Sequence, residues 1–152
     1  MKIEGSVALV TGANRGLGKA YVEALRAAGA AKIYAGARQP SDVIDSRVIP
    51  IRLDVTSPAD VESAAQRCQD VNILINNAGV MLKSPMLAEG SDVSMRREME
   101  VNVFGMLAMI RAFAPILAKN GGGTIANMLS VVSWFTFPST RPTVPRNTPH
   151  WR

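Results

Sequence analysis

Short apolar runs alternate with longer amphipathic stretches through most of the chain. The run "SVALVTG" stops at a glycine, which is typical of a strand, and apolar residues at helical spacing follow it as far as Gly29. That spacing predicts a helix whose apolar face consists of Leu17, Ala20, Tyr21, Ala24, Leu25 and Ala28. Further strands are expected at "AKIYAGA", "RVIPIRLDV", "VNILINNAGV" and "TIANMLSVV".

Two more helices are expected between these strands. Ser57 is a good N-cap, Pro58 suits the first helical position, and Asp60 three residues after the serine indicates a start similar to a capping box. The apolar face of this helix is predicted to be Val61, Ala64, Ala65 and Cys68. A long helix over residues 92–119 is predicted to present an apolar stripe of Met95, Met99, Val103, Met106, Leu107 and Ile110.

The alternation of strands and helices decides the fold class. The run "VNILINNAGV" is almost continuously apolar, as expected for a strand that is buried on both faces of a parallel sheet. Parallel strands joined by helices require right-handed crossovers. We therefore predict an α/β fold, a Rossmann-like doubly wound parallel sheet of about five strands.

Composition and charge exclude several classes of function. A single cysteine cannot form an internal disulfide, the N-terminus shows no signal-peptide pattern, and no apolar run approaches the roughly 20 residues of a bilayer span. We expect a cytoplasmic protein without a membrane role or a metal site. The net charge is +5, but without Arg141, Arg146 and Arg152 the first 140 positions hold 14 basic and 12 acidic residues. Those basic residues are expected to be scattered singly, so no nucleic-acid partner is predicted.

The first predicted strand runs into "TGANRGLG", which places Gly12, Gly16 and Gly18 in a TGxxxGxG spacing. Gly12 allows a tight turn, Gly16 lets the backbone approach a pyrophosphate, and Gly18 lets the helix pack closely on the sheet. The N-terminus of that helix offers amide donors and a positive dipole to the phosphates. The alternative is a plain tight turn, and the position between a first strand and a first helix favours dinucleotide binding.

Three more motifs follow in order, namely "LDVT" at 53–56, "NNAG" at 76–79 and "VNVFG" at 101–105. Together with the glycine turn they make residues 2–138 closely similar to the short-chain dehydrogenase/reductase family of Rossmann-fold oxidoreductases. The resemblance implies interconversion of a carbonyl and an alcohol, usually by a homo-oligomer, and contact of Asp54 and Val55 with adenine. With the residues of the glycine turn and the two arginines discussed below, the predicted cofactor-binding residues are Gly12, Asn14, Arg15, Gly16, Leu17, Gly18, Arg38, Asp54, Val55, Asn77, Ala78 and Gly79, of which the last five carry the roles that the resemblance implies. An alternative role for Asn76 and Asn77 is to cap the end of their strand.

The choice of cofactor follows from charge at the end of the second strand. An acidic residue there would bind the ribose 2′-hydroxyl of NAD, whereas an arginine accommodates the 2′-phosphate of NADP. The sequence reads "YAGAR", with Ala37 and then Arg38, and Arg15 in the glycine turn can reach the same place. We predict NADP(H) in preference to NAD, against the alternative that both arginines are merely solvated.

The resemblance also implies a catalytic set of Asn, Ser, Tyr and Lys, in which the tyrosine is the general acid/base. Asn102 and Ser130 occupy the matching positions for the first two, with Ser133 as the alternative serine. The tyrosine is expected near position 142, followed four residues later by lysine. The chain has only Tyr21 and Tyr34, and no lysine follows Lys119. We therefore expect this chain to be catalytically inactive.

The final stretch "FPSTRPTVPRNTPHWR" has four prolines in sixteen residues and suits neither a helix nor a central strand. We expect an incomplete cofactor-binding domain over 1–138 and an irregular tail over 139–152. A shifted reading frame accounts for this tail, since permitted codons for residues 142–151 also encode Tyr-Cys-Ala-Ser-Lys in another frame. A functional proline-rich tail is the alternative, and in either case the single histidine, His150, is expected to be solvated rather than catalytic.

Without the family's remaining strands, the fifth strand is expected to be an unpaired edge and the chain to associate or aggregate. Two alternatives to an enzyme stay open at this point. One is an interaction or regulatory fragment that pairs with a full-length relative through the long helix, and the other is a cofactor-binding module without chemistry. The methionine and phenylalanine content indicates only that a substrate would be a small apolar carbonyl or alcohol.

Overall fold

The computed structural model describes residues 2–40, 47–85 and 87–130. Ser133, Trp134 and the proline-rich tail, on which several expectations rest, lie outside these residues. The described elements are β1 (Val7–Thr11), α1 (Gly16–Ala27), β2 (Lys32–Ala37), β3 (Val48–Arg52), α2 (Pro58–Arg67), β4 (Ile73–Asn76), α3 (Ser91–Met99), the π-helix η1 (Glu100–Gly105), α4 (Met106–Lys119) and β5 (Thr124–Asn127).

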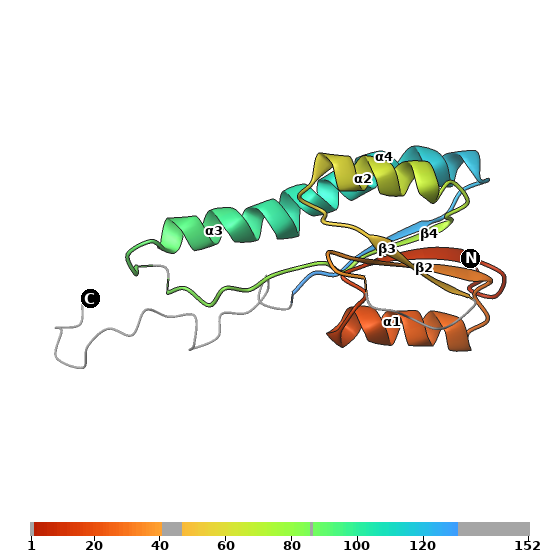
Figure 1. Cartoon of the computed structure of the whole chain (residues 1–152), viewed down its shortest axis with the longest axis horizontal. Coiled ribbons are helices and arrows are strands. Elements are labelled where there is room, and N and C mark those ends of the chain that lie inside the picture. The colour runs from red at the N-terminus through yellow and green to blue at the C-terminus, as the bar shows by residue number, and fades with distance from the viewer. Residues whose placement is uncertain (1, 41–46, 86, 131–152) are drawn as a thin grey trace, which may run out of the picture.

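The predicted fold class is confirmed. The five strands form one sheet in the order β3-β2-β1-β4-β5, and every neighbouring pair is parallel. Helix α1 covers one face, while α2 and α4 cover the other (Figure 1). Each face has its own apolar core, with Val10 and Ile33 on the α1 side and Leu9, Leu74 and Phe113 on the side of α2 and α4. Among the described residues β5 pairs only with β4, so it lies at the edge of the sheet as expected.

Helix α2 begins as its sequence predicts, with one difference. Ser57 Oγ accepts the backbone N–H of Asp60 at 3.2 Å, and Pro58 is at the first helical position. The carboxylate of Asp60 does not return to the backbone of Ser57, which a full capping box requires. Asp60 Oδ2 instead accepts the N–H of Asp54 at 2.9 Å, so this helix start also fixes the segment that follows β3.

The predicted apolar face of α1 is only partly right. Leu25 is buried, but Leu17 is 63% exposed, and the buried side of the helix consists of Gly18, Val22 and Leu25. The helix is rich in alanine and glycine, so hydrophobic periodicity could not select one face. The close approach of Gly18 to β1 makes that selection, because only a residue without a side chain fits there.

The long helix is continuous, but its predicted stripe does not face the sheet. Met95, Met99 and Leu107 are exposed. The buried residues recur at a spacing close to four, and they are Val101, Gly105, Met109, Phe113, Ile116 and Leu117. Two features explain the error: apolar residues occur all round this helix, and the wide turn of η1 shifts the register between α3 and α4.

Residues Ser91–Lys119 form one helix of 29 residues whose most apolar window has a mean hydropathy of 1.8. By length and composition alone this helix is long and apolar enough to cross a membrane, contrary to the expectation from continuous apolar runs in the sequence. Met109 and Phe113 of this helix are fully buried in the apolar core on the face of the sheet that α2 and α4 cover. A core helix passes the same test, so this composition adds no argument for a membrane role.

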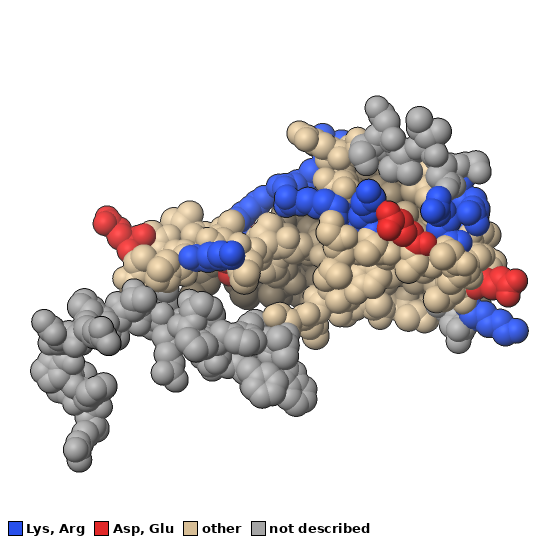
Figure 2. All heavy atoms as spheres, turned by 90° about the horizontal axis from the view of Figure 1, so that it is seen from below, with Lys and Arg blue, Asp and Glu red and all other residues tan. Residues whose placement is uncertain are grey.

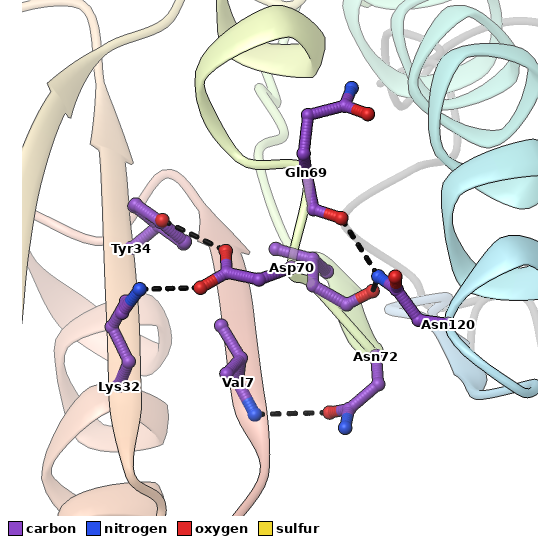
Figure 3. A network of polar contacts seen from close by, with 8 residues as sticks. Val7, Lys32, Tyr34, Gln69, Asp70, Asn72 and Asn120 are labelled. Carbon is purple, nitrogen blue, oxygen red and sulfur yellow. Dashed lines mark hydrogen bonds and ion pairs between the residues drawn. The ribbon is translucent and has the colours of Figure 1, made fainter.

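Side chains at the amino ends of the strands tie the sheet together (Figure 3). The carboxylate of Asp70 pairs with the Lys32 ammonium and accepts the Tyr34 hydroxyl at 2.9 Å. Burial would raise the pKa of Asp70, but these two hydrogen bonds outweigh it and lower that pKa below its ordinary value. Asp70 therefore links β2 to the residues that lead into β4.

Replacing Asp70 by asparagine is expected to reduce the free energy of unfolding at neutral pH by about 1 kcal/mol, since the side chain is 43% exposed and its ion pair is partly screened. A depressed pKa contributes stability above the unfolded-state value near 4, and this contribution disappears as the pH falls through the lower folded-state value. Urea unfolding at pH 7 and pH 3 checks this: the difference from wild type should shrink at pH 3. Glu89→Gln on an exposed turn is the control, and an equal loss at both pH values would contradict the assignment.

Candidate functional site

A pocket of about 850 Å³ opens at the carboxyl ends of the strands, opposite the Asp70 network. Its lining comes from the β1–α1 turn, the ends of β2 and β3, the segment after β4, and the helix α3–η1. In an open parallel sheet this edge is where ligands bind, at the place where the strand order reverses. Here the reversal lies between β1 and β4.

All twelve residues predicted to bind a cofactor line this one pocket, although they come from four separate motifs. The lining residues that were not among the predicted cofactor-binding residues are Ala37, Gln39, Arg52, Leu53, Val80, Arg97 and Val101. Most of these residues are direct neighbours of predicted residues in the sequence, so extending each motif by one or two positions would have included them. Arg97 is the exception, because it lies on α3, outside every cofactor motif.

The three glycines of the first turn have different surroundings. A Cβ on Gly18 would lie 2.1 Å from the carbonyl oxygen of Gly12 and 2.7 Å from Asn77 Nδ2, so this position admits only glycine. Gly16 has a φ of +54° and open space where its Cβ would be. Among the described residues no side chain caps helix α1, and its first residues line the pocket, so its first amides are available to a ligand there. The turn is therefore built both for tight packing and for close approach of an anion.

Thr11 and Asn77 hold this turn against the end of β4. The buried Thr11 hydroxyl accepts the backbone N–H groups of Asn77 and Ala78, each at 2.9 Å. Asn77 Nδ2 donates to the carbonyl oxygens of Thr11 at 2.9 Å and Gly12 at 3.3 Å. Asn77 therefore does more than cap the end of its own strand, because its side chain joins the end of β4 to β1 and the turn after it. Thr11 is a supporting residue that none of the sequence predictions singled out.

Asn76 points away from this arrangement. Its Nδ2 donates to Asn127 Oδ1 at 2.9 Å, which links β4 to β5. Its buried Oδ1 has no hydrogen-bond partner among the described residues. Asn76 is 5% exposed and does not line the pocket. The alternative role at the end of the strand, without contact to a cofactor, therefore suits Asn76 better than Asn77.

Four arginines, Arg15, Arg38, Arg52 and Arg97, surround the pocket, against the single carboxylate of Asp54. The expectation that basic residues are scattered singly is therefore wrong at this site, and Figure 2 shows Lys and Arg side chains gathering along one face. Only Arg52 has a carboxylate within ion-pair distance in the described part of the chain, since its Nε lies 3.5 Å from Asp60 Oδ2. The site therefore carries an excess of positive charge that suits an anionic ligand.

Asp54 remains ionised in this surrounding. Burial would raise its pKa, but hydrogen bonds from the Thr56 backbone N–H and hydroxyl, with the charges of Arg38 and Arg97, lower it below the ordinary value. Both hydrogen bonds from Thr56 go to Oδ1, at 2.9 and 2.7 Å. The second carboxylate oxygen accepts none from the described residues, so it is available to a ligand donor.

The two predicted catalytic residues lie outside the pocket lining. Asn102 is on η1, where its Oδ1 accepts the N–H of Val80 and its Nδ2 donates to the Val80 carbonyl, both at 2.8 Å. It thereby fixes the segment after β4 to the helix beside it. Ser130 is exposed beyond the end of β5. Their catalytic roles remain predictions.

A parallel sheet with a glycine turn at its switch point places the chain among the Rossmann-fold proteins, a class in which dinucleotides bind at this edge of the sheet. The chain belongs to the short chain dehydrogenase family, whose model matches residues 6–142.

Known relatives agree with this assignment. The short chain dehydrogenase citE of Monascus ruber is 36% identical over 155 residues, which cover 90% of this chain and 53% of that protein. The 3-oxoacyl-[acyl-carrier-protein] reductase FabG of Escherichia coli is 34% identical over 141 residues, which cover 87% and 57%. A crystal structure of a short chain dehydrogenase from Burkholderia cenocepacia in complex with NADP has a TM-score of 0.86 and 46% identity, covering 92% of this chain and 60% of that one. The chain thus spans about half the length of the curated relatives it matches.

Proposed function

We propose that the pocket binds NADP(H) and that the chain derives from an oxidoreductase that interconverts a small carbonyl and an alcohol. The observation that carries the proposal is the meeting of the glycine turn with Arg15 and Arg38, two cations without an ion-pair partner in the described residues, in one pocket. The turn supplies the amides that a pyrophosphate requires. Gly16 leaves open space in the pocket that a pyrophosphate can fill, and a side chain at this position would take up that space.

The end of β2 supports NADP(H) rather than NAD. Ala37 and Arg38 line the pocket there, and no carboxylate stands at this strand end among the described residues to bind a ribose 2′-hydroxyl. A free guanidinium offers paired donors to a 2′-phosphate. The short chain dehydrogenase of Burkholderia cenocepacia, 46% identical to this chain, was solved in complex with NADP, which agrees with this choice.

The chain of 152 residues is expected to bind the cofactor without turning over a substrate. Neither tyrosine lines the pocket: the Tyr21 hydroxyl donates to Met128 Sδ, and Tyr34 lies in the Asp70 network at the opposite edge of the sheet. Loss of a general acid/base typically slows a reaction by about 10² to 10⁴. The exposed side chains of Met81 and Leu82, beside Val80, favour a substrate with an apolar body.

Titration with NADPH and NADH, followed by fluorescence or calorimetry, tests the cofactor. Arg38→Gln is expected to weaken NADPH binding by roughly 10- to 100-fold, because it removes charge-assisted hydrogen bonds to the 2′-phosphate, and to leave NADH nearly unchanged. Arg111→Gln, on the exposed side of α4, is the matched control. Equal or tighter binding of NADH by the wild-type chain would overturn the choice of NADP(H), and steady turnover would overturn the expected inactivity.

A second candidate function is favoured by one observation on the long helix. Met95, Met99, Phe104 and Leu107 are between 37% and 53% exposed along α3, η1 and α4. Apolar side chains in this arrangement are typical of a helix that pairs with a partner. The candidate is a fragment that binds a full-length relative through this helix. Co-expression with a tagged relative tests it, and failure to copurify would exclude that pairing.

A further inference from the structure

Arg97 lines the pocket although it lies outside every motif that predicted a cofactor-binding residue. It lies on α3, one helical turn before Val101, and both residues line the pocket. No hydrogen bond or ion pair holds its guanidinium among the residues that the structure describes. Arg52, the other arginine that the motifs missed, differs because Asp60 partly neutralises it. Arg97 therefore lines the ligand site from the helix as a cation without a hydrogen bond or close ion pair to the described residues, and its charge acts on Asp54.

The other parts of a dinucleotide can be allotted to the pocket by general rules. A pyrophosphate binds at the glycine turn and the first amides of α1, and the ribose with its 2′ substituent binds at the end of β2. These rules assign Arg15 and Arg38 to the phosphates. Besides residues 77–80, which follow β4, the part of the lining that remains lies between the end of β3 and the helix. It consists of Arg52, Leu53, Asp54, Val55, Arg97 and Val101.

This remaining part holds Asp54 and Val55, which the family resemblance assigns to adenine, and its other residues also have the chemistry of an adenine site. Leu53, Val55 and Val101 offer apolar surface to the faces of a ring, and Asp54 offers a carboxylate oxygen without a hydrogen bond from the described residues. Adenine has an amino donor beside ring nitrogens that accept, so it needs an acceptor and a donor from the protein. Asp54 supplies the acceptor. The guanidinium of Arg97 supplies donors, and as a planar cation it also binds well to an aromatic ring.

We propose that Arg97 contacts the adenine ring and thereby contributes to the binding of both forms of the cofactor. The proposal rests on the proposed function, since it assumes that a nicotinamide adenine dinucleotide occupies the pocket. It differs from the role of Arg38 in a measurable way. Adenine is common to NADH and NADPH, whereas the 2′-phosphate belongs to NADPH alone.

Dissociation constants of NADPH and NADH for the wild-type chain, Arg97→Gln, Arg38→Gln and Arg96→Gln test the proposal. Arg97→Gln is expected to weaken both cofactors by the same factor, roughly tenfold. Arg38→Gln should weaken NADPH alone. Arg96→Gln is the matched control, because Arg96 is the exposed neighbour on the same helix and does not line the pocket. Thermal unfolding of each variant confirms that it folds, and Arg97→Lys serves as a second variant that keeps the charge but loses the planar group.

Three results would count against the proposal. If Arg97→Gln weakens only NADPH, Arg97 acts on the 2′-phosphate and not on adenine. If Arg97→Gln binds both cofactors as the wild type does, while Arg38→Gln loses NADPH, the role of Arg97 is wrong and the proposed function stands. If the folded wild-type chain binds neither cofactor, both fail together.

Discussion

Gly18→Ala is expected to abolish cofactor binding and to destabilise the fold. The added methyl would stand 2.1 Å from the Gly12 carbonyl oxygen and 2.8 Å from its carbon, and backbone atoms cannot turn aside as a flexible side chain can. Relief requires α1 to move away from β1, which breaks the contacts of Asn77 with the turn. Overpacking of this kind typically costs about 1 to 3 kcal/mol and occasionally more. Thermal unfolding and NADPH titration measure the two effects.

Two other glycines separate binding from stability. Gly16 and Gly5 both have positive φ, +54° and +73°, and at neither residue does any atom lie within 4 Å of the place where a Cβ would stand. Alanine at either site should therefore cost only about 1 kcal/mol of backbone strain. Gly16→Ala is expected to lose NADPH binding because its methyl enters the pocket, whereas Gly5→Ala should bind normally. If Gly18→Ala kept both wild-type stability and wild-type affinity, the close packing at this turn would be refuted.

Phe113→Ala is expected to cost about 3 to 5 kcal/mol of unfolding free energy. Phe113 is a fully buried residue of α4, in the same core cluster as Leu9, Leu74 and Met109. Truncation leaves a cavity that the rigid sheet cannot fill. Because small domains are typically stable by only about 5 to 15 kcal/mol, a large share of the protein should unfold well below the wild-type melting temperature.

Phe104→Ala provides a matched control for this prediction. Phe104 lies on the same long helix, but its side chain is 53% exposed, so its removal creates no cavity. Urea unfolding of both variants should show a large loss for Phe113→Ala and a change within about 0.5 kcal/mol for Phe104→Ala. Similar losses for the two variants would mean that the burial of the helix has been assigned to the wrong face.

Alternation of apolar strands with amphipathic helices was sufficient to predict the parallel sheet. A parallel connection needs a helix and has one favoured hand, so few topologies remain once the alternation is recognised. The motifs likewise identified twelve lining residues of the pocket, because most of them follow the end of a strand and all parallel strands end at the same edge. The helix faces were harder to predict: in α1 and α4 apolar residues lie on more than one side, and local periodicity does not record which side meets the sheet.

The sequence by itself thus determined the fold class and the twelve predicted residues that meet in the pocket, since these depend on local patterns that the chain carries in order, whereas the binding of a dinucleotide there stays a prediction. Only the tertiary structure decided that Arg97 joins Arg38 and Asp54, because a residue on α3 and the ends of β2 and β3 come together through packing alone. It also decided that Asn77 joins β1 to β4 while Asn76 joins β4 to β5. Asn76 is the last residue of β4 and Asn77 follows it, so their side chains point to different neighbours, and which neighbour each one contacts depends on how the strands pack.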